Sequence, residues 1–183
     1  MPLPTLQSAR LTLRSFNPSD AANLVRLAGA REVAATTLRI PHPYRDADAE
    51  HFIAGTKRHA ESGQAVVFAI ELNEARKLVG AIGLEIQSGH RHAELGYWIG
   101  VPYWGNGYAT EAGHAILRYG FESLHLHRIW AMHFVENPAS GKVLRKLGMK
   151  HEGTLRGHVL KWEVFHDAPF YGILHSEWPP KKE

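Results

Sequence analysis

The sequence predicts a single mixed α/β domain of the α+β type, and three observations carry this prediction. Segments with period-two hydrophobicity alternate with segments whose apolar residues recur at helical spacing. The 183 residues suffice for one domain with a substantial core. The chain also lacks internal repeats, low-complexity segments and interdomain linkers. We therefore expect one domain over residues 1–183, with its core at about 9–178 and a frayed tail at 179–183.

The composition is that of a water-soluble protein. Hydrophobic residues make up 44% and charged residues 21% of the chain. There is no apolar run near the ~18 residues that a membrane span requires, and the N-terminus lacks the basic-then-apolar order of a signal peptide. The absence of cysteine excludes disulfides and thiolate chemistry. We expect a cytoplasmic protein with no membrane partner.

The charge distribution favours a small anionic ligand over nucleic acid. The formal net charge is +3 and the basic residues are scattered along the chain. The 13 histidines are mostly isolated, apart from the pairs His90/His92 and His125/His127. Neither pair has cysteine or the spacing of a zinc motif nearby, so we expect no metal site.

Period-two patterns predict the strands. They lie at residues 9–15, 64–72, 77–86, 92–100, 128–135, 149–156, 159–165 and 170–177. In the fourth of these strands Glu94, Gly96 and Trp98 share one face, and Leu95, Tyr97 and Ile99 share the other. The short polar segment 73–76 predicts a hairpin between the second and third strands.

Capping residues and apolar spacing predict four helices. Asn17-Pro18 opens the first, Asp46 caps a second that extends to about Glu61, and Asn137-Pro138 opens the last, which ends at Leu147. The best amphipathic pattern spans Tyr108 to Leu124. The proline-containing loop Thr36–Tyr44 is either a substrate wall or an ordinary connection.

A glycine-containing turn at residues 103–112 joins the fourth strand to this amphipathic helix. Backbone N–H groups at a helix start favour an anion. A nucleotide-binding Walker loop requires a lysine, but Asn106-Gly107 follow Gly105. A dinucleotide-binding turn requires a third glycine, where Thr110 stands. Both alternatives are therefore disfavoured.

The motif Trp104-Gly105-Asn106-Gly107-Tyr108-Ala109-Thr110-Glu111-Ala112 resembles the acyl-coenzyme-A pyrophosphate loop of GNAT N-acetyltransferases, in the form used by their ribosomal-protein-alanine branch. Further similar motifs lie in order along the chain from Leu11 to Trp178. They are Glu94–Ile99, Asn137–Ser140, Leu144–Met149, Glu152–Arg156, Asp167, Tyr171, Leu174 and Glu177-Trp178.

This resemblance implies the fold and the reaction. The family has a central, mostly antiparallel sheet that is splayed between its fourth and fifth strands and flanked by about four helices. Its members transfer an acetyl group from acetyl-CoA to a primary amine by direct attack, through a tetrahedral intermediate. The expected partner is thus a small-molecule or peptide amine, with a protein N-terminal α-amine among the candidates.

The resemblance also implies which residues bind acetyl-CoA. Pantetheine would pair with backbone near Trp98, Ile99 and Gly100, and Asn137 matches a residue that contacts the cofactor in relatives. The pyrophosphate would be held by the backbone N–H groups of Gly105, Asn106, Gly107, Tyr108, Ala109 and Thr110, and Trp104 is a further cofactor-binding residue of the same loop. Trp104 departs from the superfamily pattern, which has arginine or glutamine there, so the role of its side chain is open.

Two residues are candidates for proton transfer. Glu94 is a candidate base because it precedes the cofactor segment and shares a strand face with Trp98; an exposed strand carboxylate is the equal alternative. Many superfamily members use a tyrosine of the last helix as the acid, but residues 138–147 contain none. Ser140 is the only hydroxyl there and matches the serine given that role in this branch; an ordinary first-turn serine is the alternative.

Other functions remain open at this stage. A non-catalytic acyl-CoA-binding sensor or scaffold would show the same cofactor motifs. A nucleotide-binding or nucleic-acid-binding module is disfavoured by the missing Walker lysine and the missing basic stripe. An exposed strand edge in the splayed sheet could support a homodimer.

Overall fold

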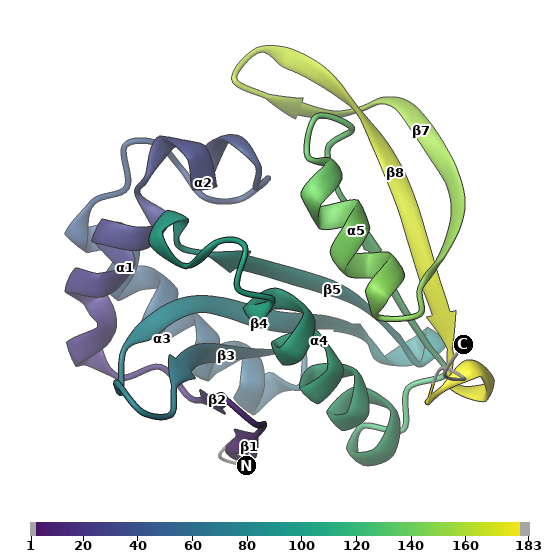
Figure 1. The fold of residues 1–183 in the computed structure, drawn as a ribbon, viewed down its shortest axis with the longest axis horizontal. Helices are drawn as coiled ribbons and strands as arrows, with labels where there is room; N and C mark the ends of the chain where they lie inside the picture. Colours follow the sequence, from purple (N-terminus) through teal and green to yellow (C-terminus); the bar gives the residue numbers. More distant parts are fainter. Residues whose placement is uncertain (1–2, 180–183) are drawn as a thin grey trace.

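An eight-stranded sheet forms the centre of the fold, in the order β1-β2-β3-β4-β5-β6-β8-β7 (Figure 1). Every neighbouring pair is antiparallel except β5 and β6, which are parallel. The strands are β1 Leu6–Gln7, β2 Leu11–Arg14, β3 Ala65–Leu72, β4 Leu78–Gln87, β5 His92–Ile99, β6 Arg128–Met132, β7 Lys150–Lys161 and β8 Val164–Leu174. The predicted mixed α/β fold with a mostly antiparallel sheet is confirmed.

The computed structural model describes residues 3–179. The predicted tail, apart from Pro179, therefore lies outside the described residues. The short strand β1 pairs with β2 and was not expected from the sequence, because two residues are too few to show alternation.

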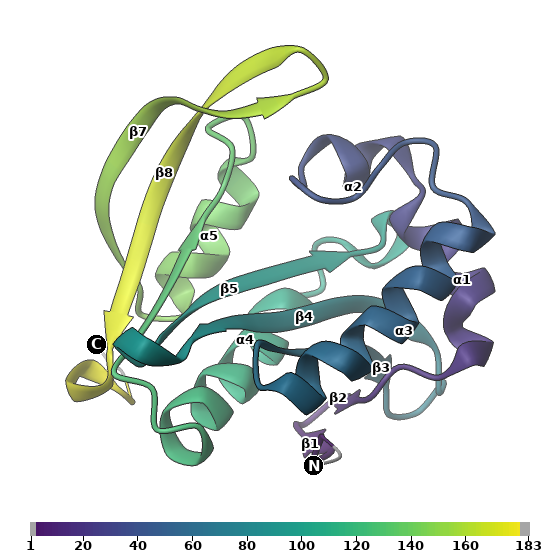
Figure 2. The same cartoon turned by 180° about the vertical axis from the view of Figure 1, so that it is seen from behind.

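Helices cover both faces of the sheet. They are α1 Ala21–Ala28, α2 Arg31–Ala35, α3 Asp46–Ser62, α4 Tyr108–Arg118 and α5 Pro138–Lys146. The views in Figures 1 and 2 place α1 and α3 on one face and α4 on the other, with α5 beside the C-terminal strands. The described residues thus contain five α-helices where about four were expected. The additional helix, α2, has only five residues and gives no periodic signal.

The C-terminal strands differ from the prediction. Three strands were expected over residues 149–177, but β7 and β8 form one long hairpin. Its two turn residues, Trp162 and Glu163, have φ values of 48° and 64°. Tight hairpin turns of this kind usually carry Asn-Gly or Asp-Gly, so Trp162-Glu163 could not be recognised as a turn from its residue types. A shift in register between Leu155 and Val159 accommodates residues 157–158, which had separated two of the predicted strands.

Helix α4 packs its apolar face on the sheet, as predicted. Ala112, Ile116 and Leu117 are fully buried, and a π-helical turn at 119–123 continues the helix. Gly113 lies directly under Leu147, and a Cβ atom at Gly113 would come within 2.6 Å of Leu147 Cδ1. The missing side chain therefore lets α5 approach α4 closely, which fixes the position of the residues that α5 carries.

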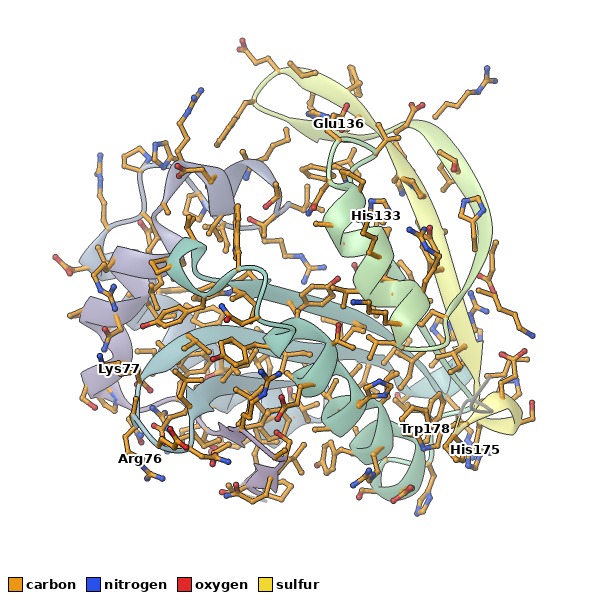
Figure 3. All side chains as sticks on the ribbon, in the orientation of Figure 1. Arg76, Lys77, His133, Glu136, His175 and Trp178 are labelled. Atoms are coloured by element: carbon orange, nitrogen blue, oxygen red, sulfur yellow. The ribbon has the colours of Figure 1, made fainter. Side chains whose placement is uncertain are left out.

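Aromatic residues close the core at the C-terminal end of the sheet. His175 stacks on Phe121 with ring centroids 5.6 Å apart, and Trp178 lies 5.8 Å from the same ring. Figure 3 shows His175 and Trp178 together beside the end of α4. His175 and Trp178 thus pack against the end of the helix that begins at the glycine turn.

Truncation of Leu147 tests the packing of α5 on α4. Leu147 is fully buried, so Leu147→Ala should lower the free energy of unfolding by about 2–5 kcal/mol, through lost burial and the cavity that remains. Urea unfolding measures this loss. Val135→Ala, at a position 49% exposed, is the control and should change stability by less than ~0.5 kcal/mol. Equal effects of the two variants would contradict the packing described.

Candidate active site

The parallel strands β5 and β6 are paired only at their beginning. Their register pairs His92 with Arg128, Ala93 with Ile129 and Glu94 with Trp130, where the pairing ends. Beyond this point β5 runs away from β6 and α5 (Figure 1). One edge of β5 over Leu95–Ile99, called here the open edge, is therefore left without a strand partner. This is the splay that the family resemblance implied.

The register with β4 decides which backbone groups face the open edge. Gly100 N–H donates to Val79 O at 2.8 Å, and Trp98 lies opposite Ala81 on β4. Because successive residues of a strand direct their backbone groups to opposite edges, Tyr97 and Ile99 present theirs to the open edge.

This register refines the expected pantetheine segment. The backbone N–H groups of Trp98 and Gly100 are turned toward β4, and the Trp98 side chain packs in a cluster that includes Ala69 and Leu78. Of the three residues expected to pair with pantetheine, only Ile99 directs its backbone groups to the open edge; Tyr97, which was not among the three, also does so.

Trp104 ties the glycine turn to the end of β5. Its indole Nε1–H donates to Ile99 O at 2.6 Å, while almost half of the side chain is exposed. A short 3-10 turn at Val101–Tyr103 brings the chain round so that this contact forms. The indole thus connects the glycine turn to the backbone of β5 through a hydrogen bond. This is the contact that Trp104 makes at the position where the superfamily pattern has arginine or glutamine.

The rest of the turn leaves an uncapped helix start. Gly105 and Gly107 have φ values of 77° and 79°, a conformation that L side chains rarely adopt. Asn106 Nδ2 donates to the carbonyls of Tyr103 and Trp104 at 3.1 and 3.0 Å.

No side chain among the described residues caps α4. As in any helix, the N–H groups of the first turn, at Tyr108, Ala109 and Thr110, have no intrahelical acceptor. Since no side chain caps them either, they are available to an anion, which the helix dipole also favours.

The segment between β1 and β2 supports the same helix. Glu111 Oε1 accepts hydrogen bonds from Ser8 Oγ at 2.8 Å and from Arg10 N–H at 2.7 Å, and Glu111 Oε2 accepts one from Arg10 Nε at 2.7 Å. Burial raises the pKa of Glu111, but these hydrogen bonds and the Arg10 charge outweigh it, so the pKa is lowered overall. The charge of this carboxylate is balanced by Arg10 and does not oppose an anion at the helix start.

Glu94 lies at the point where the strands part. It shares a face with Trp98, on the side of the sheet that α1 and α3 cover. The Glu94 side chain is 25% exposed, and Arg39 Nη2 lies 3.7 Å from its Oε2. Glu85, directly opposite on β4, forms an ion pair with the same arginine. Burial raises the pKa of Glu94, and the Arg39 charge opposes this rise.

Ser140 lies on the other side of the sheet, in the first turn of α5. Its N–H donates to Asn137 Oδ1 at 3.3 Å, so Asn137 is the N-cap that the sequence predicted. The Ser140 hydroxyl lies 2.7 Å from Tyr97 Oη. The alternation in the sequence placed Tyr97 on one strand face with Leu95 and Ile99, but no local signal could reveal a partner 43 residues away.

The loop Thr36–Tyr44, which the sequence left as either a substrate wall or an ordinary connection, contacts the tip of the C-terminal hairpin. Lys161 Nζ donates to Ile40 O at 2.7 Å and Leu38 O at 3.3 Å. Lys161 is buried, and burial lowers its pKa. This contact joins the N-terminal and C-terminal parts of the chain on the side of the sheet where Glu94 lies, so the loop has a defined position beside the site.

The described residues contain neither a metal-binding cluster nor a helix that could span a membrane. They contain no group of three or more His, Cys, Asp or Glu side chains placed to hold a metal ion. None of the helices in this part of the chain has the length and apolarity needed to cross a membrane.

Comparison with known families identifies the chain. The acetyltransferase (GNAT) domain model matches residues 10–150. The chain belongs to the GNAT acetyltransferase family. It is 31% identical over 175 residues to an uncharacterized N-acetyltransferase of Bacillus subtilis (strain 168), a match covering 93% of this chain and 97% of that protein.

Members of the ribosomal-protein branch are among the relatives of this GNAT protein. The [ribosomal protein uS5]-alanine N-acetyltransferase of Escherichia coli (strain K12) is 30% identical over 122 residues, covering 66% of this chain and 63% of that enzyme. The structure of Mycobacterium smegmatis RimJ in complex with CoA-disulfide superposes with a TM-score of 0.88 at 25% identity, over 97% of this chain and 90% of that one. The GNAT protein is accordingly an acetyl-CoA-dependent N-acetyltransferase, and acetyl-CoA is its acyl donor.

Substitution of Trp104 tests the hydrogen bond between its indole and Ile99. Trp104→Phe keeps an aromatic ring but removes the N–H that holds Ile99 O. We expect the Kd for acetyl-CoA to rise about three- to tenfold, the equivalent of one hydrogen bond in a preorganised loop. Isothermal titration calorimetry measures it, and Trp162→Phe at the tip of the hairpin is the control. An unchanged Kd in Trp104→Phe would show that the loop keeps its shape without the indole.

Proposed function

We propose that this protein transfers the acetyl group of acetyl-CoA directly to a primary amine, with a protein N-terminal α-amine as the preferred acceptor. The observation that carries the proposal is the placement of Glu94 and Ser140. They lie on opposite faces of the sheet, next to the open edge of β5 and on either side of it. An amine approaching from the Glu94 face and a thiolate departing on the Ser140 face fit direct attack, without a covalent enzyme intermediate.

The cofactor would lie along the open edge. The uncapped start of α4 would hold the pyrophosphate, at Gly105, Asn106, Gly107, Tyr108, Ala109 and Thr110. The N–H groups of Tyr97 and Ile99 are the available partners for pantetheine and for the oxyanion of the tetrahedral intermediate. One such donor typically contributes about 2.7–4 kcal/mol to lowering the barrier.

An α-amine suits the modest base that the site offers. With a pKa near 8, it is about one-tenth neutral at pH 7, whereas a lysine side chain near 10.4 is neutral far more rarely. The similarity to an enzyme named for the alanine of ribosomal protein uS5 supports the same acceptor class. Glu94 would accept the proton that the attacking amine releases, directly or through water.

Glu94 as base makes a prediction about pH. A protonated carboxyl cannot accept a proton, so kcat/KM should fall as the pH drops through the pKa of Glu94, which burial has raised. Arg39→Met removes the cation that lowers this pKa, so the acid limb should move to higher pH. A pH–rate profile at saturating acetyl-CoA measures the limb, with Arg58→Met on the exposed side of α3 as control. An acid limb that stays in place in Arg39→Met contradicts the role of Glu94.

The role of Glu94 can also be tested by removing the charge alone. Glu94→Gln should lower kcat on the order of 10²-fold, as expected for loss of a general base. Glu74→Gln, in the exposed turn between β3 and β4, should leave kcat unchanged. If both variants keep wild-type turnover, the base is water or another residue.

The proposed activity itself is tested by thiol release from acetyl-CoA. The panel contains peptides with N-terminal alanine or serine, the same peptides with an acetylated N-terminus, spermidine, free lysine and an aminoglycoside. We expect the free peptides to be acetylated fastest and the blocked peptides not at all. Stoichiometric binding of acetyl-CoA without transfer to any amine would instead indicate the sensor or scaffold function.

A further inference from the structure

Tyr97 and Ser140 connect two parts of the protein that diverge at the site. Tyr97 belongs to β5, and Ser140 belongs to α5, which follows β6. The two side chains meet three residues beyond Glu94, where the pairing of β5 and β6 has ended. Their hydrogen bond therefore crosses between the two parts beside the path that the cofactor would take along the open edge.

The chemistry of the two hydroxyls indicates which one donates. Tyr97 Oη lies 2.7 Å from Ser140 Oγ and 3.3 Å from Ser140 O. A phenol is far more acidic than an aliphatic alcohol, so the shorter contact is best made with the tyrosine as donor and the serine oxygen as acceptor. In this arrangement the Ser140 hydroxyl does not donate its proton to Tyr97, so its O–H bond can point toward the open edge.

The surroundings keep this arrangement fixed. Burial raises the pKa of Tyr97 to about 12. The phenol thus stays protonated and remains a donor at every working pH. The Ser140 backbone is held separately, because its N–H donates to Asn137 Oδ1. One partner fixes the serine backbone and the other fixes its hydroxyl.

We propose that Tyr97 is a positioning residue that directs the Ser140 O–H toward the departing sulfur, an inference that rests on the proposed acetyl transfer. When the tetrahedral intermediate collapses, the C–S bond breaks and its electron pair goes to sulfur. The Ser140 proton moves to that sulfur and gives the free thiol of CoA. As the Ser140 proton leaves, the more acidic Tyr97 hydroxyl passes its proton along the hydrogen bond to Ser140 Oγ, so no serine alkoxide remains. Solvent then returns to Tyr97 a proton equivalent to the one that the attacking amine released.

A double-mutant cycle tests this role. Tyr97→Phe keeps the ring and removes only the hydroxyl, and Ser140→Ala removes the acid. We expect Tyr97→Phe to lower kcat by on the order of tenfold to a hundredfold, with the KM for acetyl-CoA within about twofold of wild type. Since Tyr97 acts through Ser140, the double variant should be no slower than Ser140→Ala alone. The solvent isotope effect on kcat should increase in Tyr97→Phe, as proton transfer becomes more strongly rate-limiting.

Matched controls separate positioning from folding. Tyr119→Phe removes the hydroxyl of another partly buried tyrosine, which packs edge-on against Phe68 away from Ser140, and it should leave kcat unchanged. Urea unfolding of Tyr97→Phe should follow that of Tyr119→Phe.

The outcomes distinguish this inference from the proposed function. Wild-type kcat in Tyr97→Phe together with a slow Ser140→Ala would overturn the role of Tyr97 and leave the acid role intact. Multiplicative losses in the double variant would also overturn it, because the two residues would then act independently. Wild-type kcat in Ser140→Ala would reject the acid itself, and absence of any acetyl transfer by the wild-type protein would reject the proposed function; either result rejects the inference as well.

Discussion

The end of pairing between β5 and β6 at Glu94 and Trp130 is the constraint on which the rest of the site depends. A strand that loses its neighbour leaves backbone N–H and C=O groups that require partners. In this protein Ile99 O receives the Trp104 indole, while the other groups of the open edge stay available beside the glycine turn. The same divergence therefore shapes the glycine turn and leaves an extended row of donors and acceptors next to it.

The two faces of the sheet divide the chemistry. On the face of α1 and α3, partial burial raises the pKa of Glu94 and makes it a stronger base than an exposed carboxylate, while the nearby Arg39 charge opposes this rise. On the opposite face, Ser140 is fixed by Asn137 and Tyr97. The close packing of Leu147 over Gly113 holds the helix that carries Ser140 against α4. Packing in the core thus sets the distance between the loop that would hold the cofactor and the proposed acid.

The sequence predicted the parts of this site that depend on local patterns. Alternation over 92–100 separated the face of Glu94 from the face of Tyr97, and Asn137-Pro138 marked the start of α5. Properties set by tertiary pairing could not be predicted. The direction of the Trp98 and Gly100 N–H groups follows from the register with β4, and the partners of Tyr97, Arg39 and Lys161 are distant in sequence. The single β7–β8 hairpin was missed for a different reason, because Trp162-Glu163 lacks the residues typical of such a turn.

Residue-resolved amide hydrogen exchange with and without CoA tests the central claim most directly. If the open edge and the start of α4 bind the cofactor, CoA should slow exchange at Tyr97, Ile99 and Tyr108–Thr110. Exchange at Trp98 and Gly100 should change little, because β4 already protects those N–H groups. Protection by CoA at other sites, with unchanged exchange at Tyr97 and Ile99, would contradict the account.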